Sequence, residues 1–113
     1  MDAKSKNPLT KEGRIYTLYI FEWDGIKAEI NLKKHQVSFD EAQTVFYDEY
    51  ALMIHDVDHS DVEDRFIMLG MSARANLLVV CYCERGEEDN VIRIISSRKA
   101  NKRESAQYWA RRK

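Results

Sequence analysis

The side chains best suited to acid–base chemistry fall into two short segments of this chain. Lys34 and His35 are adjacent, and a second segment, residues 58–65, contains His59 and Glu63. Histidine exchanges a proton near neutral pH, and lysine or glutamate can do so when their surroundings shift the pKa. Positive charge could come from three arginines, Arg65, Arg93 and Arg98. A guanidinium binds phosphate through two donors, so these residue types together suit chemistry on a phosphodiester.

Positive charge is concentrated at the C-terminal end. Residues 91–113 contain eight Lys or Arg against one acidic residue, whereas residues 22–90 contain 16 Asp or Glu against six Lys or Arg. The formal net charge of −1 therefore hides a polarised chain. A basic segment on an acidic body predicts a phosphate-rich ligand. Further contacts to that ligand are expected from Lys27, Lys99, Lys102, Arg103 and Tyr108.

The basic segment is predicted to be a strand followed by a helix. Residues 91–96 are rich in β-branched side chains, and the serines at 96 and 97 could end the strand and cap a helix over residues 98–113. Arg98 would then lie beside the free N–H groups of that helix, where a phosphate is favoured.

The strand itself leaves two roles open for Arg93. Strict alternation places Arg93 with Val91 and Ile95 on one face, and Ile94 with Ser96 on the other. A partly buried structural role therefore competes with a catalytic role for Arg93. Tyr82, in the adjacent predicted strand, could stack on a nucleic-acid base, but packing in the core is favoured.

Residues 58–65 also have a purely structural interpretation. Ser60 and Glu63 have the spacing of a capping box, which predicts a turn with no chemical role. The carboxylates of this segment could bind a metal ion, but they lack an established ligand spacing and no Cys or His pair stands beside them. We therefore expect neither a metal ion nor another cofactor.

The length of 113 residues predicts one domain with one core. Residues 1–14 contain the only proline and show no apolar periodicity, which predicts a flexible arm ahead of a single domain over residues 15–113. Strands are predicted over residues 15–21, 50–55, 65–71, 76–84 and 91–96, and helices over residues 22–34 and from Ser38 onward. Short polar connections favour antiparallel pairing of the last four strands, so the predicted fold class is α+β.

Both predicted N-terminal helices have a cap and a core face. Asp24 is the expected N-cap of the first helix, with Ile26, Ile30 and Val37 facing the core. Its opposite, polar face consists of Lys27, Asn31, Lys34 and His35. The second helix has Ser38 as N-cap, Glu41 at the third helical position, and a core face of Ala42, Val45 and Phe46.

Cysteine usage and hydropathy indicate a cytoplasmic protein. Cys81 and Cys83 lie two residues apart in a predicted strand, a spacing that suits a disulfide poorly, and we interpret them as core residues. No apolar run approaches the ~18–20 residues of a membrane span, and no signal peptide is visible. We expect no membrane contact.

Several blocks of residues occur in the order and spacing of a known family. They are residues 21–24 (FEWD), Asn31, 34–35 (KH), 37–42 (VSFDEA), Phe46 with Asp48, 58–60 (DHS) with Glu63, 65–66 (RF), Gly70 with Ser72, 93–96 (RIIS), 98–100 (RKA), 103–104 (RE) and Tyr108. Over about residues 20–108 the chain resembles the BrnT family, ribonuclease toxins of bacterial type II toxin–antitoxin modules. Gln36 departs from the usual glycine and Ser97 from the usual alanine, and neither change removes an ionisable group.

The resemblance implies a fold, an activity and a partner. The implied fold is RelE-like α+β, with two N-terminal helices and a C-terminal helix packed on a mostly antiparallel sheet of four to five strands. The implied activity is RNA cleavage that halts translation. The implied partner is a BrnA-type antitoxin with a ribbon-helix-helix domain, through which the complex binds operator DNA. Such complexes often contain two toxins.

Metal-free RNA cleavage needs a base, an acid and cations. The base takes the proton of the attacking ribose 2′-hydroxyl, the acid protonates the leaving 5′-oxygen, and the cations stabilise the phosphoryl oxygens. Lys34, His35, His59 and Glu63 are the candidates for proton transfer, and Arg65, Arg93 and Arg98 for charge stabilisation. A non-catalytic nucleic-acid-binding module using the basic C-terminal helix is the alternative function, and a metal-dependent nuclease is a weaker third.

Overall fold

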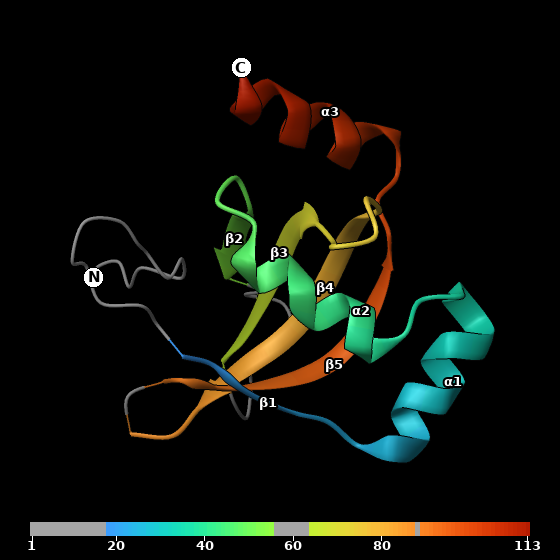
Figure 1. The fold of residues 1–113 in the computed structure, drawn as a ribbon, viewed down its shortest axis with the longest axis vertical. Helices are drawn as coiled ribbons and strands as arrows, with labels where there is room; N and C mark the ends of the chain where they lie inside the picture. The colour runs from blue at the N-terminus through green and yellow to red at the C-terminus, as the bar shows by residue number, and fades with distance from the viewer. Residues whose placement is uncertain (1–17, 56–63, 88) are drawn as a thin grey trace.

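The computed structural model describes residues 18–55, 64–87 and 89–113 (Figure 1). In chain order the elements are β1 (Ile20–Glu22), α1 (Gly25–His35), α2 (Phe39–Gln43), the 3-10 helix η1 (Thr44–Tyr47), β2 (Leu52–His55), β3 (Arg65–Met71), β4 (Leu77–Arg85), β5 (Val91–Lys99) and α3 (Lys102–Arg112). The strands form one sheet in the order β1-β5-β4-β3-β2. β1 is parallel to β5 and the other pairs are antiparallel, which confirms the predicted α+β class.

The observed element bounds agree with the predicted bounds in the middle of the chain and differ from them at its two ends. β3 has the predicted bounds, and β2 and β4 lie within two residues of theirs. The strand expected over residues 15–21 is seen only as β1, and the predicted arm over residues 1–14 lies outside the described residues. No helix in the described part of the chain has the length and apolarity of a membrane span.

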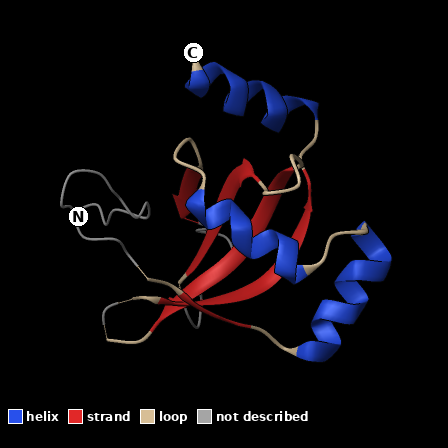
Figure 2. Cartoon of the chain, viewed as in Figure 1, coloured by secondary structure: helices blue, strands red, loops and turns tan. Residues whose placement is uncertain are grey.

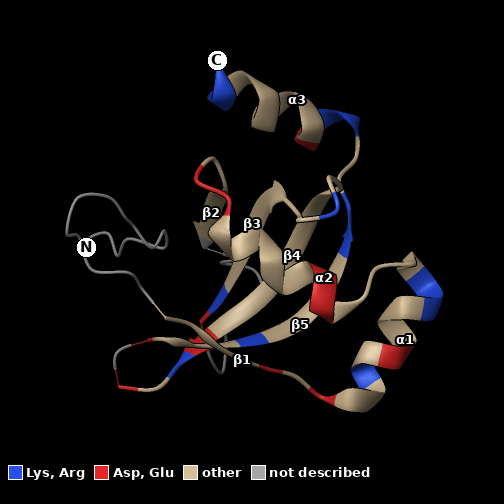
Figure 3. Ribbon diagram, in the orientation of Figure 1, with Lys and Arg blue, Asp and Glu red and all other residues tan. Residues whose placement is uncertain are grey.

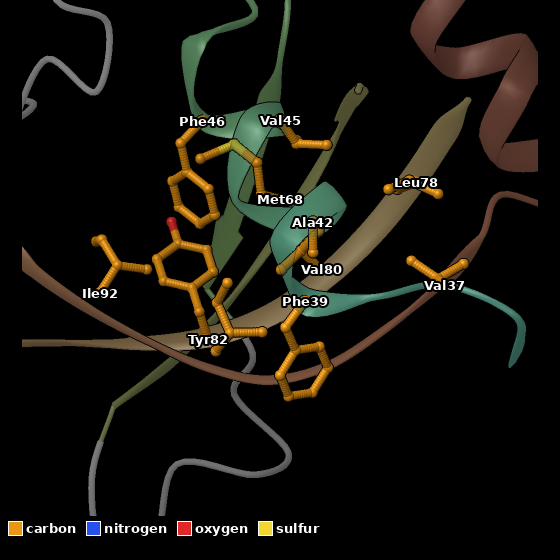
Figure 4. Packing of buried hydrophobic residues seen from close by; sticks show 11 residues of the cluster. Val37, Phe39, Ala42, Val45, Phe46, Met68, Leu78, Val80, Tyr82 and Ile92 are labelled. Atoms are coloured by element: carbon orange, nitrogen blue, oxygen red, sulfur yellow. The ribbon is translucent and has the colours of Figure 1, made fainter. Parts of the chain in front are cut away.

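One face of the sheet carries the main core, under α2 and η1 (Figures 2 and 4). The predicted core residues of this segment, Ala42, Val45 and Phe46, are all buried. Tyr82 is fully buried beneath them, with its ring centroid 4.8 Å from that of Phe46 and 5.6 Å from that of Phe66. Its favoured interpretation as a core residue is therefore confirmed.

The predicted caps of α1 and α2 are confirmed, but Glu41 does more than the sequence suggested. The side chains of Asp24 and Ser38 accept the backbone N–H groups of Lys27 and Glu41. The carboxylate of Glu41 does not complete a capping box in α2. It accepts hydrogen bonds of 2.7 Å from Ser72 Oγ and from Asn76 Nδ2, in the turn between β3 and β4. Glu41 therefore joins α2 to that turn.

The boundary between β5 and α3 lies later than predicted. β5 continues through both serines to Lys99, because residues 96–99 keep their pairing with β4. α3 begins only after Asn101, whose side chain accepts the N–H of Glu104 at 2.8 Å. The Glu104 carboxylate in turn accepts the N–H of Asn101 at 2.9 Å, which completes a capping box. The continued sheet pairing outweighs the tendency of serine to cap a helix.

Gly70 provides a test of the packing between η1 and β3. A Cβ at this position would lie 2.7 Å from Val45 Cγ1 and 3.0 Å from Ala51 Cβ. We expect Gly70→Ala to lower the free energy of unfolding by about 1–3 kcal/mol, the usual cost of overpacking a core.

Denaturant titration measures this change, with Gly25→Ala as the matched control. A Cβ at Gly25 meets nothing within 4 Å, so the control should be neutral or slightly stabilising at the first position of α1. Equal stability of the two variants would contradict the close approach at Gly70.

Candidate active site

A β-bulge in β5 decides which of its side chains face away from α2. Ser96 pairs with Cys81 of β4, and the next paired residue of β5 is Ile94, so Ile95 is an extra residue. Because directly paired residues share a face, Ser96 and Arg98 lie on the face opposite the main core. Strict alternation had placed Ser96 with Ile94, and the bulge makes that prediction wrong.

A pocket of about 440 Å³ lies on this face of the sheet. It brings together three of the predicted catalytic residues, His35 from the end of α1, Arg65 from the start of β3 and Arg98 from β5. The other lining residues are Ile67, Val79, Cys81, Ile95, Ser96 and Ser97. Figure 3 shows Lys and Arg on α1 and β5, two of the four elements that line the pocket. An imidazole and two guanidinium groups around one pocket can bind a phosphate and move a proton beside it.

The side chain of Asn31 fixes α1 at the edge of β5. Its Nδ2 donates to the carbonyl oxygens of Ser97 at 2.9 Å and Val37 at 3.0 Å, and its Oδ1 accepts the N–H of Ser97 at 3.1 Å. The polar face of α1 therefore points toward the sheet, and Asn31 is buried. Ile26 and Ile30, expected in the core, are 70% and 59% exposed, whereas Val37 is buried as predicted. This inversion brings His35 into the site.

A second hollow of about 210 Å³ adjoins the pocket and shares His35, Ile95 and Ser96 with it. Lys27 and Lys34 line this hollow together with Ile30 and Asn31. Within the described ranges, the side chains of Lys27, Lys34 and His35 make no hydrogen bond or ion pair with one another or with another described residue. The hollow thus extends the positive charge of the pocket along α1.

Arg98 is held by Glu104 rather than by the end of a helix. Its Nη1 and Nη2 donate to Glu104 Oε1 and Oε2 at 2.9 and 2.8 Å, a bidentate ion pair. The hydrogen bonds from Arg98 lower the pKa of Glu104, and the same contact raises the pKa of Arg98. Because β5 continues to Lys99, the expected position of Arg98 at a helix N-terminus is wrong. The ion pair holds the guanidinium in one orientation at the rim of the pocket.

The structure gives Arg93 and Tyr108 other surroundings. Arg93 donates to Glu22 of β1 at 3.1 Å and does not line the pocket, which favours its structural role. Tyr108 is fully buried, and its hydroxyl donates to Asp48 at 2.7 Å. Burial, followed by this hydrogen bond, raises the pKa of Tyr108 to about 12. The expectation that Tyr108 contacts RNA is therefore corrected, since its ring packs against Leu69 and Val79.

The remaining predicted residues lie outside the pocket or outside the described chain. Lys99, Lys102 and Arg103 are exposed at the corner between β5 and α3. His59 and Glu63, together with the Ser60 capping pattern, lie among the residues that the structure does not describe. In the described ranges, no group of three or more His, Cys, Asp or Glu side chains could hold a metal ion.

Sequence reasoning missed the anchoring role of Asn31, the partnership of Glu104 with Arg98, and the apolar lining. Asn101 and Glu104 have capping-box spacing, which could have placed both the start of α3 and a carboxylate near Arg98. Alternation along β3 and β4 could have placed Ile67 and Cys81 on one face with Arg65. The two cysteines are not joined in a disulfide, as expected.

A family model for BrnT, the ribonuclease toxin of type II toxin–antitoxin systems, matches residues 23–104. The chain belongs to the BrnT family. The crystal structure of the Brucella abortus ribonuclease toxin BrnT is similar, with 22% sequence identity, a TM-score of 0.55, and coverage of 76% of this chain and 100% of that one. Comparison with curated proteins gave no match. The resemblance found in the sequence is thereby confirmed for the family, and the structural similarity supports the BrnT fold.

Membership in the BrnT family gives the pocket its significance. The family consists of ribonuclease toxins, and a type II system implies an antitoxin partner for this chain. The matched segment contains α1, the three pocket-lining strands and Glu104. Gln36, which replaces the usual glycine of the BrnT pattern, ends α1 in the left-handed conformation with φ 58°. Glycine is common there because it adopts this conformation without strain.

The Arg98–Glu104 pair predicts a pH-dependent contribution to stability. The pKa of Glu104 is lower in the folded protein than its ordinary value of 4.5, so the contribution is fully present above that value. It is lost as the pH falls through the lower, folded-state pKa. Glu104→Gln keeps an oxygen for the Asn101 N–H but removes the charge, so it should be less stable than the native chain at neutral pH by at most about 1 kcal/mol, because the pair is partly exposed.

Urea titration of both proteins at neutral pH and at about pH 3 checks this prediction. The difference between them should shrink in acid. Glu29→Gln, at an exposed position of α1, is the matched control and should show no such change. A Glu104→Gln difference that is the same at both pH values would show that the charge of Glu104 does not stabilise the fold.

Proposed function

We propose that this BrnT-family protein is a cytoplasmic endoribonuclease that cleaves RNA without a metal ion, by attack of the ribose 2′-hydroxyl on the adjacent phosphorus. The observation that supports this most is the convergence of His35, Arg65 and Arg98 on one pocket. Imidazole can transfer a proton near neutral pH, and the two guanidinium groups can bind the phosphoryl oxygens as negative charge develops there. This chemistry requires no cofactor.

The groups around the pocket suggest a division of roles. Arg98, oriented by Glu104, would contact the phosphate through the edge of the guanidinium that the carboxylate leaves open. Lys34, in the adjoining hollow, and His35 would serve proton transfer, together with His59 or Glu63 from the segment that precedes β3. Lys27, Lys99, Lys102 and Arg103 would contact flanking phosphates and contribute affinity rather than rate.

Substitution of His35 and Arg98 tests this assignment directly. In single-turnover cleavage at saturating RNA, His35→Ala should lower the rate by roughly 10²–10⁴-fold, the usual contribution of one acid–base group. Arg98→Ala should lower it by roughly 10²–10³-fold, as for loss of an oxyanion donor. Arg98→Lys should recover little, because an ammonium group cannot bind phosphate through a fixed pair of donors.

Arg74→Ala is the matched control, since Arg74 is exposed in the turn between β3 and β4 and lies outside the pocket. It should cleave like the native protein. Products ending in a 2′,3′-cyclic phosphate, formed at the same rate in EDTA, would support the proposed chemistry. RNA that is bound but never shortened would instead indicate a nucleic-acid-binding module, and loss of cleavage in EDTA a metal-dependent nuclease.

We further propose that the partner is a BrnA-type antitoxin with a ribbon-helix-helix domain, which covers the pocket and brings the toxin, as one of two copies, to operator DNA. An acidic or amphipathic antitoxin segment would complement the positive charge of α1 and β5. Co-expression with the product of the neighbouring small gene should restore the growth that the toxin alone suppresses. Equally poor growth with and without that product would exclude neutralisation by it.

A further inference from the structure

The lining of the active-site pocket divides into a charged rim and an apolar floor. We call its three basic residues, His35, Arg65 and Arg98, the rim, and its apolar residues on the sheet surface the floor. The floor consists of Ile67 from β3, Val79 and Cys81 from β4, and Ile95 from the bulge of β5. A phosphate needs only the rim. The apolar floor can therefore accept a second, uncharged part of the ligand.

We infer that the pocket binds one unpaired nucleotide of the RNA, with its base against the apolar floor and its phosphate at the charged rim. This inference rests on the proposed function and adds the state of the substrate. A charged phosphate joined to a flat apolar ring system matches a cationic rim above an aliphatic floor.

The size of the pocket supports a single nucleotide. A volume of about 440 Å³ is toward the lower end of the roughly 300–1,000 Å³ of small-molecule sites. A base within a duplex is stacked and paired, so its ring cannot reach such a floor unless it leaves the helix. The pocket should therefore select single-stranded RNA.

The floor of the pocket is formed by aliphatic and thiol side chains, which predicts weak discrimination between bases. Aliphatic and thiol groups contact any base face, whereas hydrogen bonds to base edges would confer specificity. Ser96 offers an exposed hydroxyl on the pocket face, and Ser97, although it lines the pocket, is buried and pairs with Val80 on the core face. Base preference, if present, should be modest and should depend on Ser96.

The adjoining hollow indicates the path that the RNA would follow across the surface. It shares His35, Ile95 and Ser96 with the pocket and adds the ammonium groups of Lys27 and Lys34. A nucleotide seated in the pocket would place its neighbouring phosphate beside these lysines. The reacting phosphodiester would then lie near His35, between the two hollows.

Binding of a single nucleotide tests the inference independently of cleavage. Adenosine 3′-phosphate and uridine 3′-phosphate, titrated into the native protein and followed by NMR amide shifts, should perturb β3, β4 and β5 around the pocket. Both should bind at least about tenfold more tightly than inorganic phosphate, because the base adds apolar contact.

Cys81→Phe should fill the floor without changing any charge. It should weaken binding of both nucleotides by roughly tenfold and leave phosphate binding unchanged. Met53→Phe, on the partly exposed edge strand β2, is the control and should bind like the native protein. If melting curves show that Cys81→Phe is unfolded, Ile95→Phe at the half-buried bulge position makes the same test.

The outcomes separate this inference from the proposed function. Nucleotides that bind no more tightly than phosphate, or equally well to the filled variants, would overturn the inference even if RNA is cleaved. Nucleotide binding in the pocket without RNA cleavage would overturn the proposed function and leave the inference standing. Cleavage of a fully paired duplex as fast as of the same strand alone would also overturn the selection of unpaired RNA.

Discussion

The hydrogen bonds of the Asn31 amide to β5 are the interaction on which the site depends. β1 pairs only with residues 91–93 of β5, so the outer edge of β5 near Ser97 is not covered by a described strand. Asn31 takes the place of that strand, because it both donates to and accepts from the backbone of Ser97. A buried backbone group left without a partner costs about 1–3 kcal/mol, so the amide is held firmly in this position. It also sets the direction of α1 and hence the location of His35.

The main core and the cationic side chains of the pocket lie on opposite faces of the sheet. α2 and η1 bury the main core on one face of the sheet, while α3 covers part of the opposite face through Tyr108. The pocket occupies another part of that face, beside the end of α1. Cationic side chains can gather there because the surface stays hydrated, whereas the same charges inside the main core would be strongly destabilising.

Glu104 links the helix boundary to the chemistry of the site. One carboxylate completes the capping box at the start of α3 and also pairs with both terminal nitrogens of Arg98. The position of α3 and the orientation of the guanidinium are therefore coupled. Conformational freedom that a lone arginine would lose on binding its ligand is already lost in the folded protein.

Much of the fold could be predicted from the sequence, because β3, the caps at Asp24 and Ser38 and the core face of α2 follow from local patterns. The orientation of α1 could not be predicted. Periodicity assigns isoleucines to the core, but Ile26 and Ile30 are exposed, because bonding of Asn31 to the edge of β5 outweighs their burial. The capping-box spacing of Asn101 and Glu104 could have placed the start of α3, but only the pairing with β4 shows that β5 continues past two serines. The candidate site residues could be predicted from their residue types, whereas their grouping around one pocket depends on these two tertiary interactions.

The bulge in β5 lies in a stretch of repeated residue types, so its exact position is only partly determined by the side chains. Residues 94 and 95 are both isoleucine, so moving the extra position from 95 to 94 would place the same kind of side chain opposite Tyr82, whereas moving it to 96 or 97 would put Ile95 opposite Cys81 in place of Ser96. Side-chain patterning thus leaves two registers almost degenerate, and in both of them Ser97 keeps its place opposite Val80 and its hydrogen bonds to Asn31. The pocket face would therefore keep Ser96 and Arg98 in either register, and only the isoleucine at the extra position would change.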